Sequence, residues 1–143
     1  MVLGPPLTRT DVLLRAHSWL RPSVPHSPVS RHANEYGSYR ADCVGYVSMA
    51  WGLSVEHGDT DLAVIESVSK PLDKPALRPG DVLMRVLEIA HVAIFEGWAD
   101  DLGRTFWGLE QRVGLGTVRR RVRYPYENAS TYYRPYRYVN VLD

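Results

Sequence analysis

The spacing of apolar residues changes near residue 80, and this change constrains the fold more than any other feature of the sequence. Before residue 78, apolar side chains recur at helical spacing in short segments, separated by stretches that contain proline and glycine. After residue 80 they follow the alternation typical of β-strands, with short turn segments between them. Helices followed by strands favour an α+β domain, in which N-terminal helices pack on one side of an antiparallel sheet.

Three segments of the first half carry helix signals. Thr8 and Asp11 have the spacing of a capping box at the start of the first segment, and Asp42 is a good N-cap residue before the second. Thr60 is the expected cap of the third segment. We therefore expect helices over residues 8–20, 43–53 and 60–69.

The other segments are predicted as a long loop and a series of strands. Residues 21–41, between the first two helices, contain three prolines and Gly37, so they are predicted as an irregular loop. Residues 78–81 read Arg-Pro-Gly-Asp, the composition of a turn. After this turn, strands are expected over residues 81–87, 91–98, 104–111, 117–124 and 136–142.

Composition fits one globular domain and argues against several classes of protein. A chain of 143 residues with 45% hydrophobic and 23% charged residues has enough apolar material for one core. The net charge of +1 gives no general attraction to nucleic acid. No apolar run approaches the roughly 18 residues of a membrane span. The first residues lack the features of a signal peptide, so we expect a cytoplasmic protein if the chain is complete, and a secreted or cell-wall protein if a leader was removed.

Cys43 is the only cysteine, which excludes an internal disulfide and a cysteine-rich zinc site. It follows Asp42 and opens a predicted helix. The helix dipole and the free backbone N–H groups at that position favour a thiolate, and the same N–H groups can bind a developing oxyanion. The alternative interpretation is a small buried side chain, since free cysteine is among the most buried residue types.

A cysteine nucleophile needs a base, and five histidines compete for this role. His17 lies in the first predicted helix, His26 and His32 in the proline-rich loop, and His57 beside a turn, so all four are interpreted as surface residues. His91 differs because it begins a strongly apolar strand, which fixes its side chain at the end of the sheet.

A third group must orient the imidazole, and two neighbours on the next strand are candidates. Glu110 and Gln111 point to opposite faces because side chains alternate along a strand. Only one of them can therefore serve.

Three segments of the sequence resemble motifs of the NlpC-type, papain-like cysteine peptidase family. Residues 40–47 read Arg-Ala-Asp-Cys-Val-Gly-Tyr-Val, residues 78–83 read Arg-Pro-Gly-Asp-Val-Leu, and residues 91–97 read His-Val-Ala-Ile-Phe-Glu-Gly. Their order and spacing agree with the family over residues 36–111, about half of the chain. The resemblance implies a single papain-like domain over residues 1–143, made of an N-terminal helix and loop (1–35), the catalytic motifs (36–111) and C-terminal strands (112–143).

The resemblance implies three catalytic roles. Cys43 is the nucleophile and His91 the general base. The third residue of the family is a polar side chain on the strand after the histidine, where Glu110 falls, with Gln111 as the alternative.

It also implies substrate-binding roles for four further residues. A tyrosine upstream of the cysteine lines the oxyanion site in the family, which implies Tyr39, with Tyr36 as the alternative. Asp42 contacts a substrate amine in addition to capping the helix. Val44 departs from the family, which usually has a serine there that helps to hold the free amine of a peptide stem.

The activity implied by the resemblance is hydrolysis of an amide bond through a thioacyl intermediate, without metal or cofactor. The usual substrates of the family are peptidoglycan stem peptides. Two alternatives remain: an intracellular acyltransferase or amide-forming enzyme with the same Cys/His pair, and a catalytically inactive binding domain. The expected partner is a peptide or amide substrate, and no oligomeric state is indicated.

Two features of the C-terminal part are given structural interpretations. The basic run over residues 119–123, with four arginines, is interpreted as a solvated edge strand. The six tyrosines of residues 124–138 are interpreted as packing across the sheet.

Overall fold

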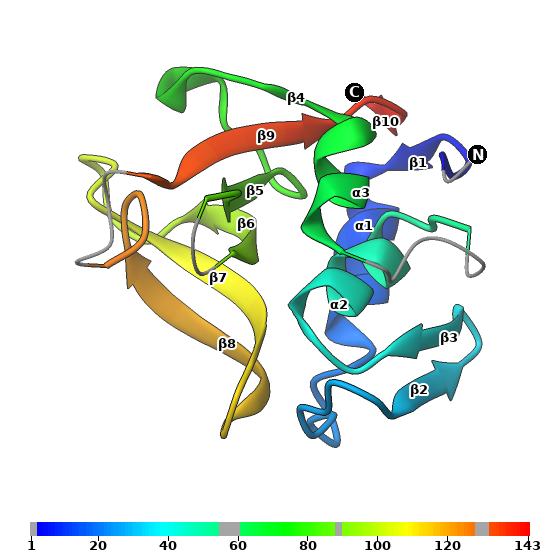
Figure 1. Cartoon of the computed structure of the whole chain (residues 1–143). Helices are drawn as coiled ribbons and strands as arrows, with labels where there is room; N and C mark the ends of the chain where they lie inside the picture. Colours follow the sequence, from blue (N-terminus) through cyan, green and yellow to red (C-terminus); the bar gives the residue numbers. More distant parts are fainter. Residues whose placement is uncertain (1–2, 55–60, 88–89, 128–131) are drawn as a thin grey trace.

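A six-stranded antiparallel sheet with helices against one of its faces forms the body of the protein (Figure 1). The computed structural model describes residues 3–54, 61–87, 90–127 and 132–143. The strand order is β4-β9-β5-β6-β7-β8, and every neighbouring pair is antiparallel. The expected α+β class is thereby confirmed. The strands are β4 (Ser69–Pro71), β5 (Val82–Arg85), β6 (His91–Trp98), β7 (Thr105–Arg112), β8 (Gly116–Arg123) and β9 (Arg134–Tyr138).

Three α-helices lie in the described ranges, each within a segment predicted to be helical. Thr8 accepts a hydrogen bond from the backbone N–H of Asp11, whose side chain accepts one from the N–H of Thr8, so the predicted capping box is confirmed. Asp42 caps the second helix and Asp61 the third, while the expected cap Thr60 lies outside the described residues. The helices are α1 (Arg9–His17), α2 (Cys43–Ala50) and α3 (Leu62–Ser67), and a 3-10 turn, η1, spans Lys74–Ala76.

The prediction of an irregular loop over residues 21–41 is wrong for its second half. Strands β2 (Arg31–Asn34) and β3 (Gly37–Arg40) form an antiparallel hairpin there. The turn is closed locally, because the Asn34 side chain accepts a hydrogen bond from the N–H of Tyr36 and Gly37 adopts a positive φ of 114°. The prolines that favoured a loop all precede the hairpin.

The last predicted strand is divided in two. β9 ends at Tyr138, and after a turn at residues 139–140 the chain forms β10 (Val141–Leu142). β10 pairs in parallel with β1 (Leu7–Thr8), so the two terminal segments lie side by side next to the helices (Figure 1). None of the helices in the described part of the chain is long and apolar enough to cross a membrane.

Strand alternation divides the buried apolar residues into two clusters on opposite faces of the sheet. The helix-side core joins α1 and α2 to strand residues such as Met84, Val92 and Leu109. The far-side core contains residues that alternate with these in sequence, together with two tyrosines of the C-terminal segment. Its members are Leu77, Leu83, Ala93, Phe95, Phe106, Val122, Tyr126 and Tyr133.

Candidate active site

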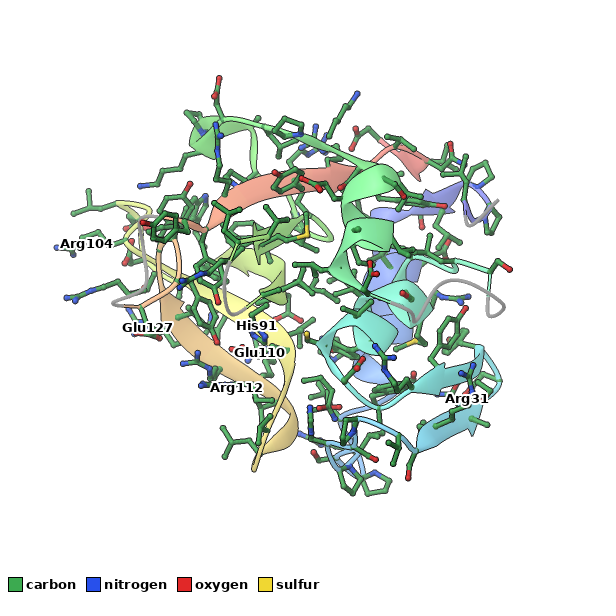
Figure 2. All side chains as sticks on the ribbon, in the orientation of Figure 1. Arg31, His91, Arg104, Glu110, Arg112 and Glu127 are labelled. Carbon is green, nitrogen blue, oxygen red and sulfur yellow. The ribbon has the colours of Figure 1, made fainter. Side chains whose placement is uncertain are left out.

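A cavity of about 430 Å³ lies between the N-terminal end of α2 and the adjoining ends of β6 and β7. Figure 2 shows His91, Glu110 and Arg112 grouped at this end of the sheet, beside α2. All three parts of the chain distinguished in the sequence, 1–35, 36–111 and 112–143, contribute to its wall. The described residues that line it are His26, Asp42, Cys43, Ala90, His91, Gln111, Arg112, Val113, Tyr126 and Tyr133.

Cys43 occupies the first position of α2, and local geometry fixes it there. Asp42 Oδ1 accepts a hydrogen bond of 2.8 Å from the N–H of Gly45, as an N-cap residue does. The helix start also packs closely on the end of β3, because a Cβ atom at Gly45 would lie 1.8 Å from the Arg40 carbonyl oxygen. Only glycine fits at this position, which holds the helix N-terminus and its cysteine against the hairpin.

His91 links Cys43 to Glu110. As the first residue of β6, it places its ring at the end of the sheet, where Nε2 lies 2.8 Å from Glu110 Oε1. The Cys43 side chain shares the cavity wall with the ring and favours its charged form. Burial opposes the charged ring, but the hydrogen bonds and negative charges of Cys43 and Glu110 outweigh this and raise the pKa of His91 to about 9. Both partners thus favour the imidazolium form of the ring.

Glu110 is a buried charge with donors on both oxygens. Its side chain is 0% exposed, Oε1 accepts a hydrogen bond of 2.6 Å from the Tyr126 hydroxyl, and Oε2 accepts one of 2.7 Å from Arg120 Nε. Burial alone raises the pKa of a carboxyl group. The hydrogen bonds from His91 and Tyr126 and the charges of His91 and Arg120 nevertheless hold the pKa of Glu110 below its usual range.

Arg120 and Tyr126 are site residues that the sequence interpretation missed. Arg120 Nη2 donates to the Tyr126 hydroxyl at 3.1 Å, and Nη1 donates to Glu127 at 3.0 Å. One sequence signal could have found Arg120. Strand alternation places it on the same face as Val122, whereas Arg119, Arg121 and Arg123 share the other face, and in the structure Val122 is buried while these three arginines are exposed. For Tyr126, at a turn beyond the motifs, the sequence gives no comparable signal.

Gln111 points to the other face of the sheet, as alternation predicts. Its amide donates to the Val24 carbonyl at 2.8 Å, and the same carbonyl accepts a hydrogen bond from the N–H of Thr117. At Gly116, φ is +73° and a Cβ atom would lie 2.6 Å from the Val24 oxygen, so glycine permits this close approach. The structure thus brings Glu110 to His91, whereas Gln111 holds the loop after α1 against the β7–β8 hairpin.

Tyr39 and Tyr36, the candidates for the oxyanion role, are not among the described residues that line the cavity. The Tyr39 side chain is 2% exposed and its hydroxyl donates to the Leu53 carbonyl at 2.6 Å, so it belongs to the helix-side core. Tyr36 packs against that core, with the Arg15 guanidinium 4.8 Å from the centre of its ring.

Asp42 lines the cavity, but Val44 does not. Both carboxylate oxygens of Asp42 have partners, since Oδ1 accepts from Gly45 and Oδ2 pairs with Arg40. Val44, expected from the resemblance to be a substrate-binding position, is 6% exposed and lies in the helix-side core.

The remaining histidines fall into different environments. His17 pairs with Glu96 on the surface, and His32 packs edge-on against Trp19 with 5.3 Å between ring centres. His26, interpreted from the sequence as a surface residue, lines the cavity. His57 lies outside the described residues.

No protein-family model matches this chain, and no curated sequence matches it. Among the described residues, no three His, Cys, Asp or Glu side chains come together as ligands for a metal ion. The site itself combines a thiol at a helix N-terminus, an imidazole at the same cavity, and a buried carboxylate hydrogen-bonded to the imidazole.

Proposed function

We propose that this protein is a papain-like cysteine hydrolase that cleaves an amide bond through a thioacyl-enzyme intermediate. Cys43 is the nucleophile, His91 the acid and base, and Glu110 the group that orients the His91 ring. The observation that carries the proposal is that Cys43 and His91 share the wall of one cavity, where the His91 ring is hydrogen-bonded to the buried carboxylate of Glu110. The fold supports it, because α2 presents its N-terminal cysteine to the end of an antiparallel sheet.

The protonation state of His91 fits the first half of such a reaction. With a pKa of about 9, the ring is an imidazolium at neutral pH, the form that pairs with a thiolate. The Cys43 sulfur attacks the carbonyl carbon, and a tetrahedral oxyanion forms. The C–N bond then breaks as the imidazolium gives its proton to the leaving amine, which leaves a thioester and a neutral His91.

The second half returns the enzyme to its starting state. Neutral His91 takes a proton from water as the water oxygen attacks the thioester carbonyl. The C–S bond breaks, the carboxylic acid leaves, and the thiolate–imidazolium pair is restored. Glu110 keeps its charge throughout, as a buried carboxylate that orients a histidine does in the serine-protease triad.

The N-terminus of α2 supplies donors for the oxyanion. The first N–H groups of an α-helix have no acceptor within the helix, and that of Cys43 belongs to this set. The helix dipole adds partial positive charge at the same point.

The substrate class we propose is a peptide or amide, with the peptidoglycan stem peptides of the resembled family as the first candidates. The surroundings of Asp42 favour substrates whose binding does not depend on a free amine. Both of its oxygens already have partners within the chain, the N–H of Gly45 and the side chain of Arg40. A stem peptide with a blocked amino terminus is therefore a better first test than one with a free amine.

The rate of alkylation by iodoacetamide between about pH 4 and pH 9 tests the proposal. Because Cys43 is the only cysteine, the reaction reports on this residue alone. Wild-type protein should react well below neutral pH, and His91→Ala should lose this reactivity, while His17→Ala, which removes a surface histidine, should keep it. A slow reaction that rises only near about pH 8.5 in all three proteins would overturn the proposal and favour a binding domain. Blocked stem peptides should then be cleaved by wild type and not by Cys43→Ala.

A further inference from the structure

Arg120 and Tyr126 enclose the carboxylate of Glu110. Arg120 reaches this carboxylate from β8, where it is the partner of Gly108 on β7. Gly108 lies two residues before Glu110, so the two residues share one face of β7. The Arg120 guanidinium contacts Glu110 through Nε and the Tyr126 hydroxyl through Nη2. Tyr126, 7% exposed, donates its hydroxyl hydrogen to Glu110, so one hydroxyl both accepts from Arg120 and donates to the carboxylate.

The charges at the site balance only when Arg120 is counted. In the reactive state two anions, the Cys43 thiolate and Glu110, share one cation, the His91 imidazolium. A buried group of net charge −1 is costly, and Glu110 competes with the thiolate for the single cation. Arg120, with 26% of its side chain exposed and Nε 2.7 Å from Glu110 Oε2, supplies the second positive charge.

We infer that Arg120 and Tyr126 are positioning residues that neutralise and hold Glu110, so that the charge of His91 is left to stabilise the Cys43 thiolate. This inference rests on the proposed function. It extends the working site beyond the motifs that resemble the peptidase family, into β8 and the turn after it.

Other charges around the site are farther from Glu110 or more exposed. Arg112 lies 3.9 Å from Glu110 with 38% of its side chain exposed, and Glu127, which pairs with Arg120, is 42% exposed. Solvent screens groups exposed to this degree, so they contribute less to the balance. The described charged and titratable groups that face the pair or line its cavity are Asp42 and Cys43 from α2 and its cap, His26 from the loop, Arg85 from β5, Arg112 from β7, Arg120 from β8, and Tyr126, Glu127 and Tyr133 from the C-terminal segment.

The inference is tested by the acid limb of Cys43 alkylation by iodoacetamide, which is the part of the pH profile where the rate rises from its low value in acid. Removing the charge in Arg120→Gln should move the pH of half-maximal rate upward by about one unit, the size of effect that a neighbouring charge has on a titration. Arg120→Lys, which keeps the charge, should stay closer to wild type, and Tyr126→Phe should shift less than Arg120→Gln, in the same direction. Arg119→Gln is the matched control, because Arg119 is the adjacent residue on β8 and pairs with Glu96 instead.

A double variant keeps the inference testable if Arg120→Gln alone fails to fold. Glu110→Gln combined with Arg120→Gln removes one negative and one positive charge, so the charges of the site balance again. The acid limb of the double variant should therefore lie at lower pH than that of Arg120→Gln. If Arg120→Gln gives no folded protein, the double variant should fold and show an acid limb. Three results would overturn the inference: no shift in Arg120→Gln, an equal shift in Arg119→Gln, or an equal shift in Arg120→Lys. Each of these leaves the proposed function intact as long as wild-type reactivity at low pH depends on His91. Loss of that dependence is instead the failure of the proposed function.

Discussion

Glu110 and Gln111 are adjacent on β7 and both are buried, yet the two faces of the sheet use them in opposite ways. On the far side, Glu110 is a charge held by three side chains, His91, Arg120 and Tyr126. On the helix side, Gln111 is a neutral amide that donates to the Val24 carbonyl and fixes a loop. The same cavity reaches both faces at this end of the sheet, since His91 and Gln111 both line it.

The difference teaches how one strand can serve reactivity and architecture at once. A buried carboxylate needs charged partners, which then respond to pH and to each other. A buried amide needs only neutral partners, and its contacts do not change with pH. Reactivity should therefore follow the Glu110 face, and the Gln111 face should affect stability alone.

The largest effect expected from this comparison is on turnover. Glu110→Gln keeps the side-chain shape but removes the charge that orients and stabilises the His91 imidazolium. Hydrolysis of an amide substrate should fall by roughly 10²–10⁴-fold, the range found for general acid–base and orienting groups. The measurement is kcat/KM on a stem peptide that the wild-type protein cleaves.

Gln111→Met is the matched control, because it replaces the neutral amide of the adjacent residue with an apolar side chain of similar length. It should leave kcat/KM close to the wild-type value. The opposite order of the two variants would transfer the third catalytic role to Gln111 and remove the distinction between the faces.

Local chemistry explains the parts of the fold and site that were predictable from the sequence. Thr8 and Asp11 cap α1 through contacts within three residues, and Asp42 caps α2 in the same way. The opposite orientations of Glu110 and Gln111 follow from strand alternation alone. Such features depend on neighbours in the chain, so a pattern of residue types is enough to find them.

Long-range contacts explain most of what was not predictable. The Tyr39 hydroxyl is taken by the Leu53 carbonyl, fourteen residues away, and this contact depends on how β3 packs beside the end of α2. Arg120 and Tyr126 join Glu110 through the register of β7 and β8 and the turn that follows. From the sequence alone, the basic run of residues 119–123 is interpreted as a solvated strand. Only the register of β7 and β8 identifies Arg120 as the arginine that contacts the buried carboxylate of Glu110.

The next effect concerns pH and should separate two kinds of substrate. In the proposed mechanism, the leaving amine takes its proton from the His91 imidazolium. Because the pKa of His91 is about 9, the ring loses this proton to solvent above that pH. Amide hydrolysis should therefore decline about tenfold per unit above about pH 9. An activated ester such as p-nitrophenyl acetate should show no such decline, because its leaving group departs as an anion and needs no proton.

The position of this alkaline limb also distinguishes the two faces. The hydrogen bond and charge of Glu110 help to raise the pKa of His91, so Glu110→Gln should move the limb to lower pH. Gln111→Met should leave it in place. An alkaline limb shared by the amide and the ester would contradict the assignment of His91 as the proton donor.

The smallest effect is on stability and belongs to the Gln111 face. Gln111→Met should lower the free energy of unfolding by about 1 kcal/mol, because a neutral hydrogen bond contributes about 0.5–1.5 kcal/mol and the Val24 carbonyl keeps its bond from Thr117. Urea denaturation measures this change, and the acid limb of Cys43 alkylation, measured on the same protein, should coincide with that of wild type. A displaced limb would mean that the loop held by Gln111 helps to set the charge state of the reactive pair. The two faces of β7 would then act as one unit, and reactivity could no longer be assigned to the Glu110 face alone.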